Sequence, residues 1–364
     1  MIHKKGIARI RVFLLAAVLS LIFVPAAFAD GSSPEALMEA GHWKQVRALA
    51  QKLAQQEPNN ARSFYLMAEV KQAFGDDAGA LPLAQKAIAL DGTNAAYHLC
   101  LAEIYGDMAQ HAGFFKQVGL ARSFKTEADK AVSLDPKNLD AHFDLLQFYL
   151  DAPGIVGGGK DKAYAEATAI AQLNPARGYS AQAQIATHDK DMNKLLTSLK
   201  AAAQADPRRY ENQIALANYY IADPHKNYDL AENYARAAIK LDAGQAGAYD
   251  VLVQVYANQQ RWKELDSILS AGKHNDPDDC GFFYQAGRIL LTQNQQLPQA
   301  EQYFRAYLSE EPEPDEPPVA AAHWRLAGVL AKEGRKPEAA AELQTALRLQ
   351  PNFPQAKKDL QELR

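Results

Sequence analysis

Apolar residues recur along most of this chain at the spacing of amphipathic helices, and the expected helices come in pairs. In the pair near the C-terminus, the first helix carries its apolar face within residues 323–330 and the second within residues 339–349. Gly334 separates the two helices and Pro351 follows the second. Apolar positions three and four apart, with breakers between the runs, are typical of helical hairpins and predict an all-α fold.

A short helix-ending motif recurs nine times, reading QQEP, ALDG, SLDP, QLNP, QADP, KLDA, HNDP, SEEP and RLQP. The last residues of these motifs are Pro58, Gly92, Pro136, Pro175, Pro207, Ala243, Pro277, Pro312 and Pro351. Their successive spacings are 34, 44, 39, 32, 36, 34, 35 and 39 residues, which is a period of 34 with insertions. A fixed period of this length indicates a repeat array. We expect the array to span residues 30–351, followed by a polar capping helix over residues 352–364.

Within the units, small and apolar residues stand at matching places, such as Leu101, Ala102 and Tyr105, or Leu216, Ala217 and Tyr220. This pattern resembles the tetratricopeptide repeat family, whose unit follows W-x₂-L-G-x₂-Y…A-x₃-F…P. The first position of that consensus holds Phe64, His98 or Tyr249 here instead of Trp. The resemblance implies an α-α superhelical solenoid of about nine tetratricopeptide-like helix-turn-helix repeats, with the first helix of each repeat lining a concave face.

Three segments depart from the bare period. The third unit carries ten extra residues around DMAQHAGFFKQVGLARSF, and the fourth carries five around DAPGIVGGGKDK. We expect these two insertions to be loops that project on the same side of the solenoid. The third segment, EPDEPP at 313–318, is interpreted as a stiff acidic linker that lets the last unit sit at a different angle.

The N-terminus has the order of a secretory signal peptide. A basic segment, MIHKKGIARIR, precedes an apolar run over residues 12–24, and small residues at Ala27 and Ala29 precede Asp30. The alternative is a retained membrane anchor, but the run is shorter than the roughly 20 residues that a spanning helix needs. We expect a signal peptide over residues 1–29, cleaved after Ala29. No Cys follows the run, so a lipid anchor is not expected, and the predicted location is periplasmic or secreted.

Charge and cysteine content narrow the classes of partner. The chain has 39 Lys and Arg against 43 Asp and Glu, and loss of the signal segment leaves 35 against 43, a net charge of −8. This balance disfavours nucleic acid and anionic lipid as partners, and no stable membrane insertion is expected after cleavage. We expect Cys100 to be buried, Cys280 to be exposed near a helix start, and the two to form no disulfide, because distant units of a solenoid do not touch.

The loop at 154–161, GIVGGGKD, almost matches the phosphate-binding motif G-x-x-x-x-G-K-[ST], but Asp161 stands at its last position. That motif needs a preceding strand, and the preceding segment here is helical. We interpret the loop as a helix connector in which Gly157, Gly158 and Gly159 permit a tight reversal. A second interpretation remains open, in which free backbone N–H groups and Lys160 hold an anion without hydrolysing it.

No motif of a catalytic site stands out. H-E-x-x-H and G-x-S-x-G do not occur, and we interpret His188, Asp189 and Asp191 as a solvated turn between helices rather than a metal site. We therefore predict no enzyme activity and no cofactor.

Recognition on the concave face is the function that remains, because an aromatic and polar groove suits an extended peptide or a partner helix. The repeat register gives the candidate partner-binding residues as Tyr65, Glu69, Glu103, Asp107, Asp140, Phe143, Gln147, Asn218, Asp250, Gln254, Tyr284 and Arg288. Four of the acids form one track that would attract a basic segment, or that merely keeps a helical face soluble. The sequence predicts an exported scaffold for protein or peptide partners, with a module that binds a glycan or small carboxylate as the alternative.

Overall fold

The computed structural model describes residues 33–363, so the expected signal peptide lies outside the described residues. Within them the chain forms 19 α-helices and one 3-10 helix, with no strand. Consecutive helices pack as antiparallel pairs, which confirms the all-α solenoid of about nine hairpins. The hairpins are α1(Pro34–Ala40) with α2(Trp43–Gln56), α3(Ala61–Ala73) with α4(Asp77–Leu90), α5(Ala95–His111) with α6(Phe114–Leu134), α7(Leu139–Asp151) with α8(Lys160–Leu173), α9(Pro175–Asp189) with α10(Met192–Ala205), α11(Tyr210–Ile221) with α12(Tyr228–Leu241), α13(Gly247–Asn258) with α14(Trp262–Asn275), α15(Gly281–Gln293) with α16(Leu297–Leu308), and α17(Val319–Lys332) with α18(Lys336–Leu349). A last helix, α19(Pro354–Glu362), follows within the expected capping segment.

Asparagine side chains define where several first helices begin. Asn60, Asn94, Asn138 and Asn174 are the N-caps of α3, α5, α7 and α9, and each side chain accepts a hydrogen bond from a backbone N–H in the first turn. Such a cap satisfies an N–H group that has no partner inside the helix, and contributes about 1 kcal/mol. An asparagine within the helix-ending motif, or two residues after it, therefore starts the next hairpin.

A second repeated contact ties each first helix to the turn before it. His98 and His142 lie on α5 and α7, and each uses Nε2 to contact the backbone oxygen of the residue six positions earlier, at 3.2 and 3.1 Å. Gln213 and Tyr249 donate to the same backbone position in their own repeats. Nδ1 of each histidine meets a glutamate of the second helix of its hairpin. At this position of the repeat, His, Gln and Tyr side chains thus make the same contact with the turn before the helix.

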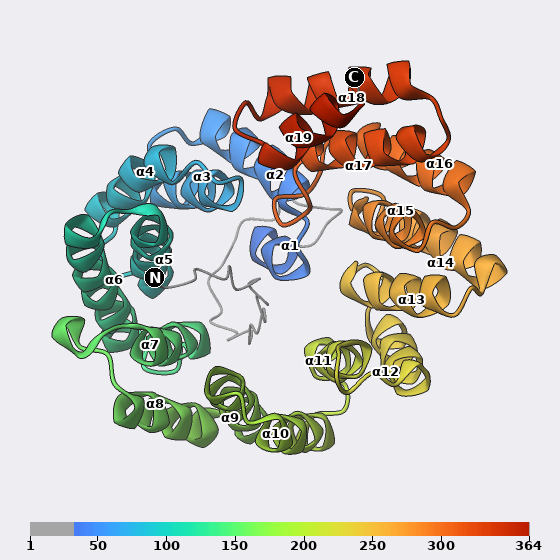
Figure 1. Ribbon diagram of the computed structural model, residues 1–364. Helices are drawn as coiled ribbons and strands as arrows, with labels where there is room; N and C mark the ends of the chain where they lie inside the picture. Colours follow the sequence, from blue (N-terminus) through green and yellow to red (C-terminus); the bar gives the residue numbers. More distant parts are fainter. Residues whose placement is uncertain (1–32, 364) are drawn as a thin grey trace.

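The hairpins follow one another around a ring (Figure 1), with first helices from α3 to α15 on the inner side and second helices outside. Alanines fill the helix contacts, for example Ala102, Ala217 and Ala327, and allow the close approach that the sequence pattern predicted. The buried apolar side chains divide into three main clusters, over residues 37–104, 102–185 and 210–356. The ring is therefore built from local packing between neighbours, as expected for a repeat array.

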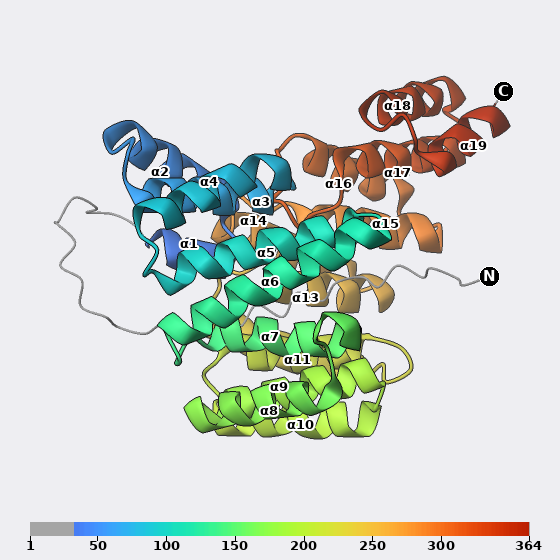
Figure 2. The ribbon, with the colours of Figure 1, turned by 90° about the vertical axis from the view of Figure 1, so that its left-hand side faces the viewer.

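The first insertion is not a loop, contrary to the expectation. It lengthens α5 to 17 residues and α6 to 21, against 13 and 14 in the α3–α4 hairpin. The residues around His111 and Phe114 continue helical runs, so helix propagation is cheaper here than an irregular excursion. The second insertion contains the short 3-10 helix η1(Gly154–Val156), which contacts α6. Both insertions lie at the same edge of the ring (Figure 2), as predicted.

The acidic segment at 313–318 is docked against other parts of the chain. Glu316 accepts hydrogen bonds from the backbone N–H groups of Cys280 and Gly281, at 2.6 and 2.7 Å, and so caps the start of α15. The Tyr307 hydroxyl donates to the backbone oxygen of Pro317. Cys280 is only 1% exposed, so the expectation that it is exposed was wrong, because Glu316 folds back over it. Cys100 is buried as expected, and neither cysteine forms a disulfide.

Candidate binding surface on the inner face

The inner face of the ring already holds one short helix. α1 lies inside the ring of first helices (Figure 1). Glu35 on α1 pairs with Arg62 on α3 at 2.7 Å, and Glu39 pairs with Arg209 at the start of α11 at 4.0 Å. Leu37 of α1 is buried in the first apolar cluster. Through these contacts α1 spans from the second hairpin to the sixth across the inner face.

A row of carboxylates follows the inner face from α3 to α7. Burial first, and then the charge of Asp144 and of three further acids, raises the pKa of Glu103 well above its ordinary value. Burial raises the pKa of Glu69, Asp140 and Asp144 to about 7. Such mutual effects require the carboxylates to lie within range of one another's field. The structure therefore brings together Glu69, Glu103, Asp107 and Asp140, as the register predicted, and adds Asp144. We call these five residues the acidic row.

The acidic row has aromatic and polar neighbours. Tyr65 is buried between α3 and α5, with its ring centroid 5.0 Å from that of Tyr97, and it hydrogen-bonds Glu69. Asp107 accepts a hydrogen bond from Gln72 at 2.9 Å, which links α3 to α5. Oδ2 of Asp144 is buried and has no hydrogen-bond partner among the described residues. The cost of burying these acids favours any cation that approaches them.

A buried arginine lies at the end of the acidic row. Arg177, on α9, is 1% exposed, and its guanidinium lies 4.6 Å from the centroid of the Phe143 ring and 3.9 Å from Asp140. Burial, and then the neighbouring charge of Arg209, lowers the pKa of Arg177 to about 9. Phe143 is therefore covered by Arg177 and is less open than expected. Gln147, one turn further along α7, is exposed and accepts a hydrogen bond from Gln184 of α9.

The remaining candidates lie on the other half of the ring. Asn218 is exposed on α11, and Gln254 is half-buried on α13. Burial raises the pKa of Asp250 to about 7, and Arg288 on α15 partly opposes this shift. Tyr284 does not face the groove: it is buried and packs on Phe304 and Tyr307 of α16. That part of the prediction is corrected, because α15 turns this position toward its own partner helix.

The glycine-rich loop is a structural connector. The N–H groups of Gly157, Gly158 and Gly159 donate to backbone oxygens of residues 149–154, at 2.9 to 3.3 Å. Lys160 is paired with Asp189 at 2.6 Å. The donors that would hold an anion are thus already used within the chain, so the anion-holding interpretation was wrong in its premise of free N–H groups.

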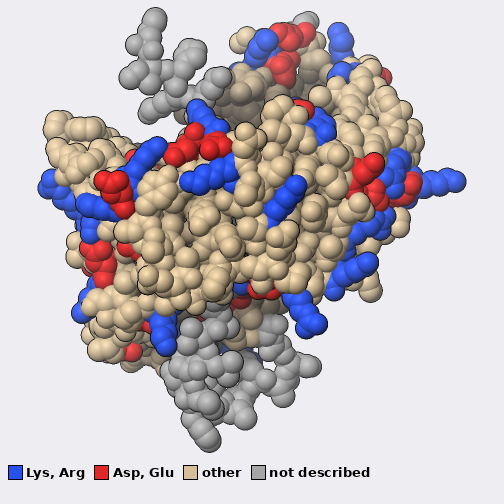
Figure 3. Space-filling view, turned by 90° about the horizontal axis from the view of Figure 1, so that it is seen from below, with Lys and Arg blue, Asp and Glu red and all other residues tan. Residues whose placement is uncertain are grey.

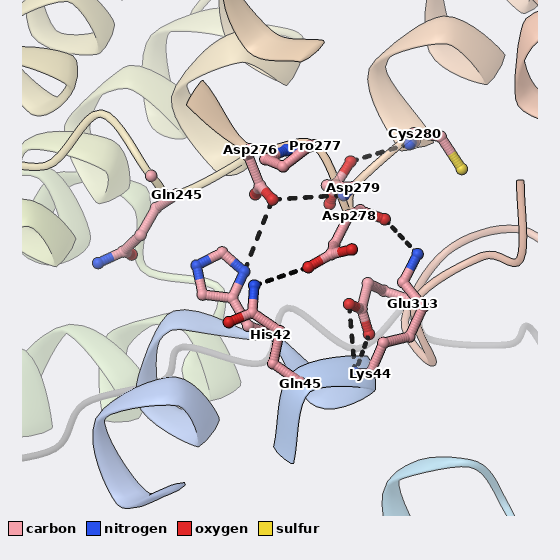
Figure 4. A network of polar contacts seen from close by, with 12 residues as sticks. His42, Lys44, Gln45, Gln245, Asp276, Pro277, Asp278, Asp279, Cys280 and Glu313 are labelled. Atoms are coloured by element: carbon pink, nitrogen blue, oxygen red, sulfur yellow. Dashed lines mark hydrogen bonds and ion pairs between the residues drawn. The ribbon is translucent and has the colours of Figure 1, made fainter. Parts of the chain in front are cut away.

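The two ends of the array meet. The start of α2 contacts the α14–α15 connector and the α16–α17 connector (Figure 4), and we call this contact the seam. The Lys44 N–H donates to Glu313 at 3.2 Å, and its ammonium group donates to the backbone oxygens of Asp278 and Glu311. Gln45 donates to the Asp278 side chain at 2.6 Å.

An ion pair and a His–Asp contact complete the seam. Arg47 forms two hydrogen bonds with Glu311, at 2.9 and 2.6 Å, and His42 lies 3.6 Å from Asp276. No apolar cluster of the described residues crosses the seam, because the first cluster ends before residue 105 and the cluster facing it begins at residue 210. The seam is therefore held by polar contacts, whereas neighbouring hairpins share apolar cores.

Other kinds of site find little support in the part of the chain that the structure describes. Among residues 33–363, no three His, Cys, Asp or Glu side chains are grouped to hold a metal ion. His188 and Asp189 belong to the end of α9, and Asp191 caps α10. No described helix is both long and apolar enough to cross a membrane. On the face formed by the elements at the bottom of Figure 1, Lys and Arg side chains are dispersed among uncharged residues (Figure 3).

The sequence did not indicate Arg177, the Glu39–Arg209 pair or the seam. Arg177 falls in the first turn of a helix, where a charged residue is ordinarily exposed, so its burial has no sequence signal. The seam depends on how many hairpins complete one turn of the ring. That number follows from small rotations between units, which the residue pattern does not encode.

Comparisons with known proteins find similarity among solved structures. No protein-family model matches the sequence, and no curated protein matches it. The structure is similar to that of yeast Tom70, with 16% identity, a TM-score of 0.47, and coverage of 91% of this chain and 79% of the other. It is similar to a tetratricopeptide repeat protein from Parabacteroides merdae, with 12% identity, a TM-score of 0.41, and coverage of 83% and 98%. YrrB, described as a TPR protein with an unusual peptide-binding site, is 18% identical with a TM-score of 0.37, and the match covers 53% of this chain and 96% of YrrB.

Proposed function

We propose that this protein is an exported, non-catalytic scaffold that binds a basic segment of a partner protein on the acidic half of its inner face. The observation that carries the proposal is the row of carboxylates from α3 to α7, and the docking of α1 shows that the inner face can hold a helix. A short helix is held there by an apolar side chain and by ion pairs at both ends, through Glu35 and Glu39. The inner face therefore offers the contacts that a helical or extended partner segment needs.

The acidic row supports a basic partner. Glu69, Glu103, Asp140 and Asp144 lie on three neighbouring first helices, and burial raises the pKa of each, so they are costly to charge together. A bound cation reduces the repulsion between the carboxylates, and this reduction makes binding of the cation more favourable. A concave surface also focuses the field of its charges better than a convex one. The order of basic, apolar and small residues before Asp30 supports export.

Two labelled peptides of equal length test the site, one alternating Lys with Phe and the other alternating Glu with Phe. We expect the Lys peptide to bind and the Glu peptide not to bind, and we expect the affinity to fall as salt screens the charges over about 10 Å at 0.1 M. Glu103→Gln with Asp107→Asn should weaken the Lys peptide several-fold. The matched control is Asp161→Asn with Asp229→Asn, which removes two exposed carboxylates from outer helices.

Equal affinity of both double variants for the Lys peptide would place binding outside the acidic row. Binding of both peptides by the wild type would show that the aromatic residues, and not the charges, carry recognition. The exported location is tested separately by the intact mass of the protein recovered from the exported fraction, which should correspond to a chain beginning at Asp30.

A further inference from the structure

The two insertions hold the most exposed large apolar side chains of the described chain. Phe115 is 91% exposed, Ile155 is 72% exposed and Phe114 is 67% exposed, whereas every other large apolar side chain is at most about half exposed. Leu349, at 52%, is the most exposed large apolar residue of the bare repeats described, so exposure of about two thirds or more is confined to the segments added to the repeat. Exposed apolar clusters of this kind mark interaction surfaces.

The exposed side chains sit on a projection and not in a groove. The extra turns of α5 and α6 extend the third hairpin at the edge of the ring where the α7–α8 connector also lies (Figure 2). Phe114 and Phe115 stack edge to face, 5.7 Å apart, and so pack on each other at the tip. η1, which carries Ile155, contacts α6 on the same edge. The tip is therefore convex, and η1 lies further along α6, where a Cβ atom at Gly157 would come within 3.4 Å of the Lys125 side chain.

Basic residues of α6 follow the exposed aromatic residues at the tip of the α5–α6 hairpin. Lys116 and Arg122 are exposed, whereas Lys125 is paired with Asp129 at 2.5 Å, so the exposed positive charges of this part of α6 are Lys116 and Arg122. The N-cap of α6 is Gly113, which supplies no side-chain hydrogen bond, so the positive end of this helix faces outward without a carboxylate or hydroxyl cap. This local charge is opposite to the net negative charge of the whole chain.

We propose that the tip of the α5–α6 hairpin, together with the η1 loop, docks reversibly on an anionic lipid surface. Aromatic side chains next to Lys and Arg on a convex helix end are suited to the interface, where the rings enter the boundary between headgroups and acyl chains and the cations meet lipid phosphates. A partner protein would need a pocket to receive such a tip, whereas a lipid surface receives it without one. Docking of this kind leaves the inner face of the ring free, so it is independent of the function proposed above.

Flotation with vesicles tests the proposal. The chain from Asp30 onward is used, so that the apolar run at 12–24 does not contribute, with vesicles of phosphatidylcholine alone or mixed with phosphatidylglycerol. We expect binding to the mixed vesicles that weakens with salt, and little binding to phosphatidylcholine. Phe114→Ser with Phe115→Ser should reduce binding about tenfold or more, and Lys116→Glu with Arg122→Glu should do the same.

Leu349→Ser is the matched control, because Leu349 is an exposed apolar residue at the far end of the array. It should bind as the wild type does, and circular dichroism should show that all variants keep their helices. Failure of the wild type to float with mixed vesicles would overturn the proposal, as would unchanged binding by the double Phe variant. A photo-crosslinker at position 115 that captures a protein, in a chain that does not bind vesicles, would assign the tip to a protein partner instead.

Discussion

Arg47 and Glu311 are 264 residues apart in sequence, and they form a doubly hydrogen-bonded ion pair across the seam. The pair joins the first hairpin to the connector after the eighth, and so closes the array into a ring. Its side chains are 31% and 57% exposed. Exposed pairs contribute about 0–1 kcal/mol each, so Arg47 and Glu311 account for only part of the closure, which the contacts of Lys44, Gln45 and His42 share.

Reversal of the charge of Arg47 should open the ring. Arg47→Glu places two acids against each other, so we expect a larger radius of gyration in small-angle scattering while the helical content stays unchanged. Glu311→Arg in the same chain restores an ion pair with reversed sign and should restore the compact form. High salt should also expand the wild type, because it screens the seam and leaves the apolar cores intact. Indifference of the radius to both changes would mean that other contacts hold the ends together.

Glu232 should stabilise the array at neutral pH and lose this effect in acid. Burial alone would raise the pKa of Glu232, but hydrogen bonds from Arg261, Arg236 and Tyr256 lower it to about 2. A carboxylate with a depressed pKa adds stability that is complete above its ordinary value near 4.5 and disappears as pH falls toward 2. Glu232→Gln should cost about 1–2 kcal/mol at pH 7 and little at pH 2.

Thermal unfolding as a function of pH measures this difference between Glu232→Gln and the wild type. Glu301 repeats the arrangement with Arg335 and Arg305, at 2.5 and 2.8 Å, so Glu301→Gln should show the same trend. A loss of stability in Glu232→Gln that does not change between pH 7 and pH 2 would show that shape, and not charge, is what Glu232 contributes.

Substitution of Gly158, in the connector at 153–159, should destabilise the protein, whereas substitution of Lys160, just after the connector, should be tolerated. A Cβ atom at Gly158 would lie 1.8 Å from the backbone oxygen of Ala152, so Gly158→Ala must displace the chain reversal. We expect a loss of about 2 kcal/mol or more, as for other substitutions with no room on the backbone side. Lys160→Ala removes an exposed ion pair and should cost less than about 1 kcal/mol. Denaturant titration compares the two, and ATP turnover lost specifically in Lys160→Ala would revive the phosphate-loop interpretation.

The hairpins and the acidic row could be predicted from the sequence because both depend on local spacing. Asn60, Asn94 and Asn138 recur beside helix-ending motifs, and the caps that they form need no distant partner. The inner faces of α3 and α5 carry Glu69, Glu103 and Asp107. The position of each residue within its repeat is enough to place it there.

What could not be predicted depends on contacts between distant segments. Cys280 is buried because Glu316, 36 residues later, folds back over it. Tyr284 was expected on the inner face, but it is buried against Phe304 and Tyr307 of the partner helix α16. The insertion after Tyr105 was expected to be a loop because it adds ten residues to the period, yet Gly113 serves as an N-cap and Gly119 is accommodated within α6.

The acidic row should make the protein less stable as pH rises through neutrality. Burial raises the pKa of Glu69 and Asp144 to about 7, so the folded chain retains protons on these groups that the unfolded chain has lost above about pH 4.5. Stability that depends on these protons is complete below about pH 4, where both states are protonated, and is lost as pH rises from there through about 7. Glu69→Gln and Asp144→Asn remove groups that repel each other, so each should raise stability at pH 8 by about 1 kcal/mol and flatten the decline. The same substitutions should weaken a Lys-containing peptide at pH 8, where the wild-type acids are charged, and change its affinity less at pH 5.5. The test is to measure the melting temperature and the peptide affinity of the wild type and of both variants between pH 5.5 and pH 8. A variant that becomes more stable at pH 8 without losing affinity would separate the buried acids from the recognition surface.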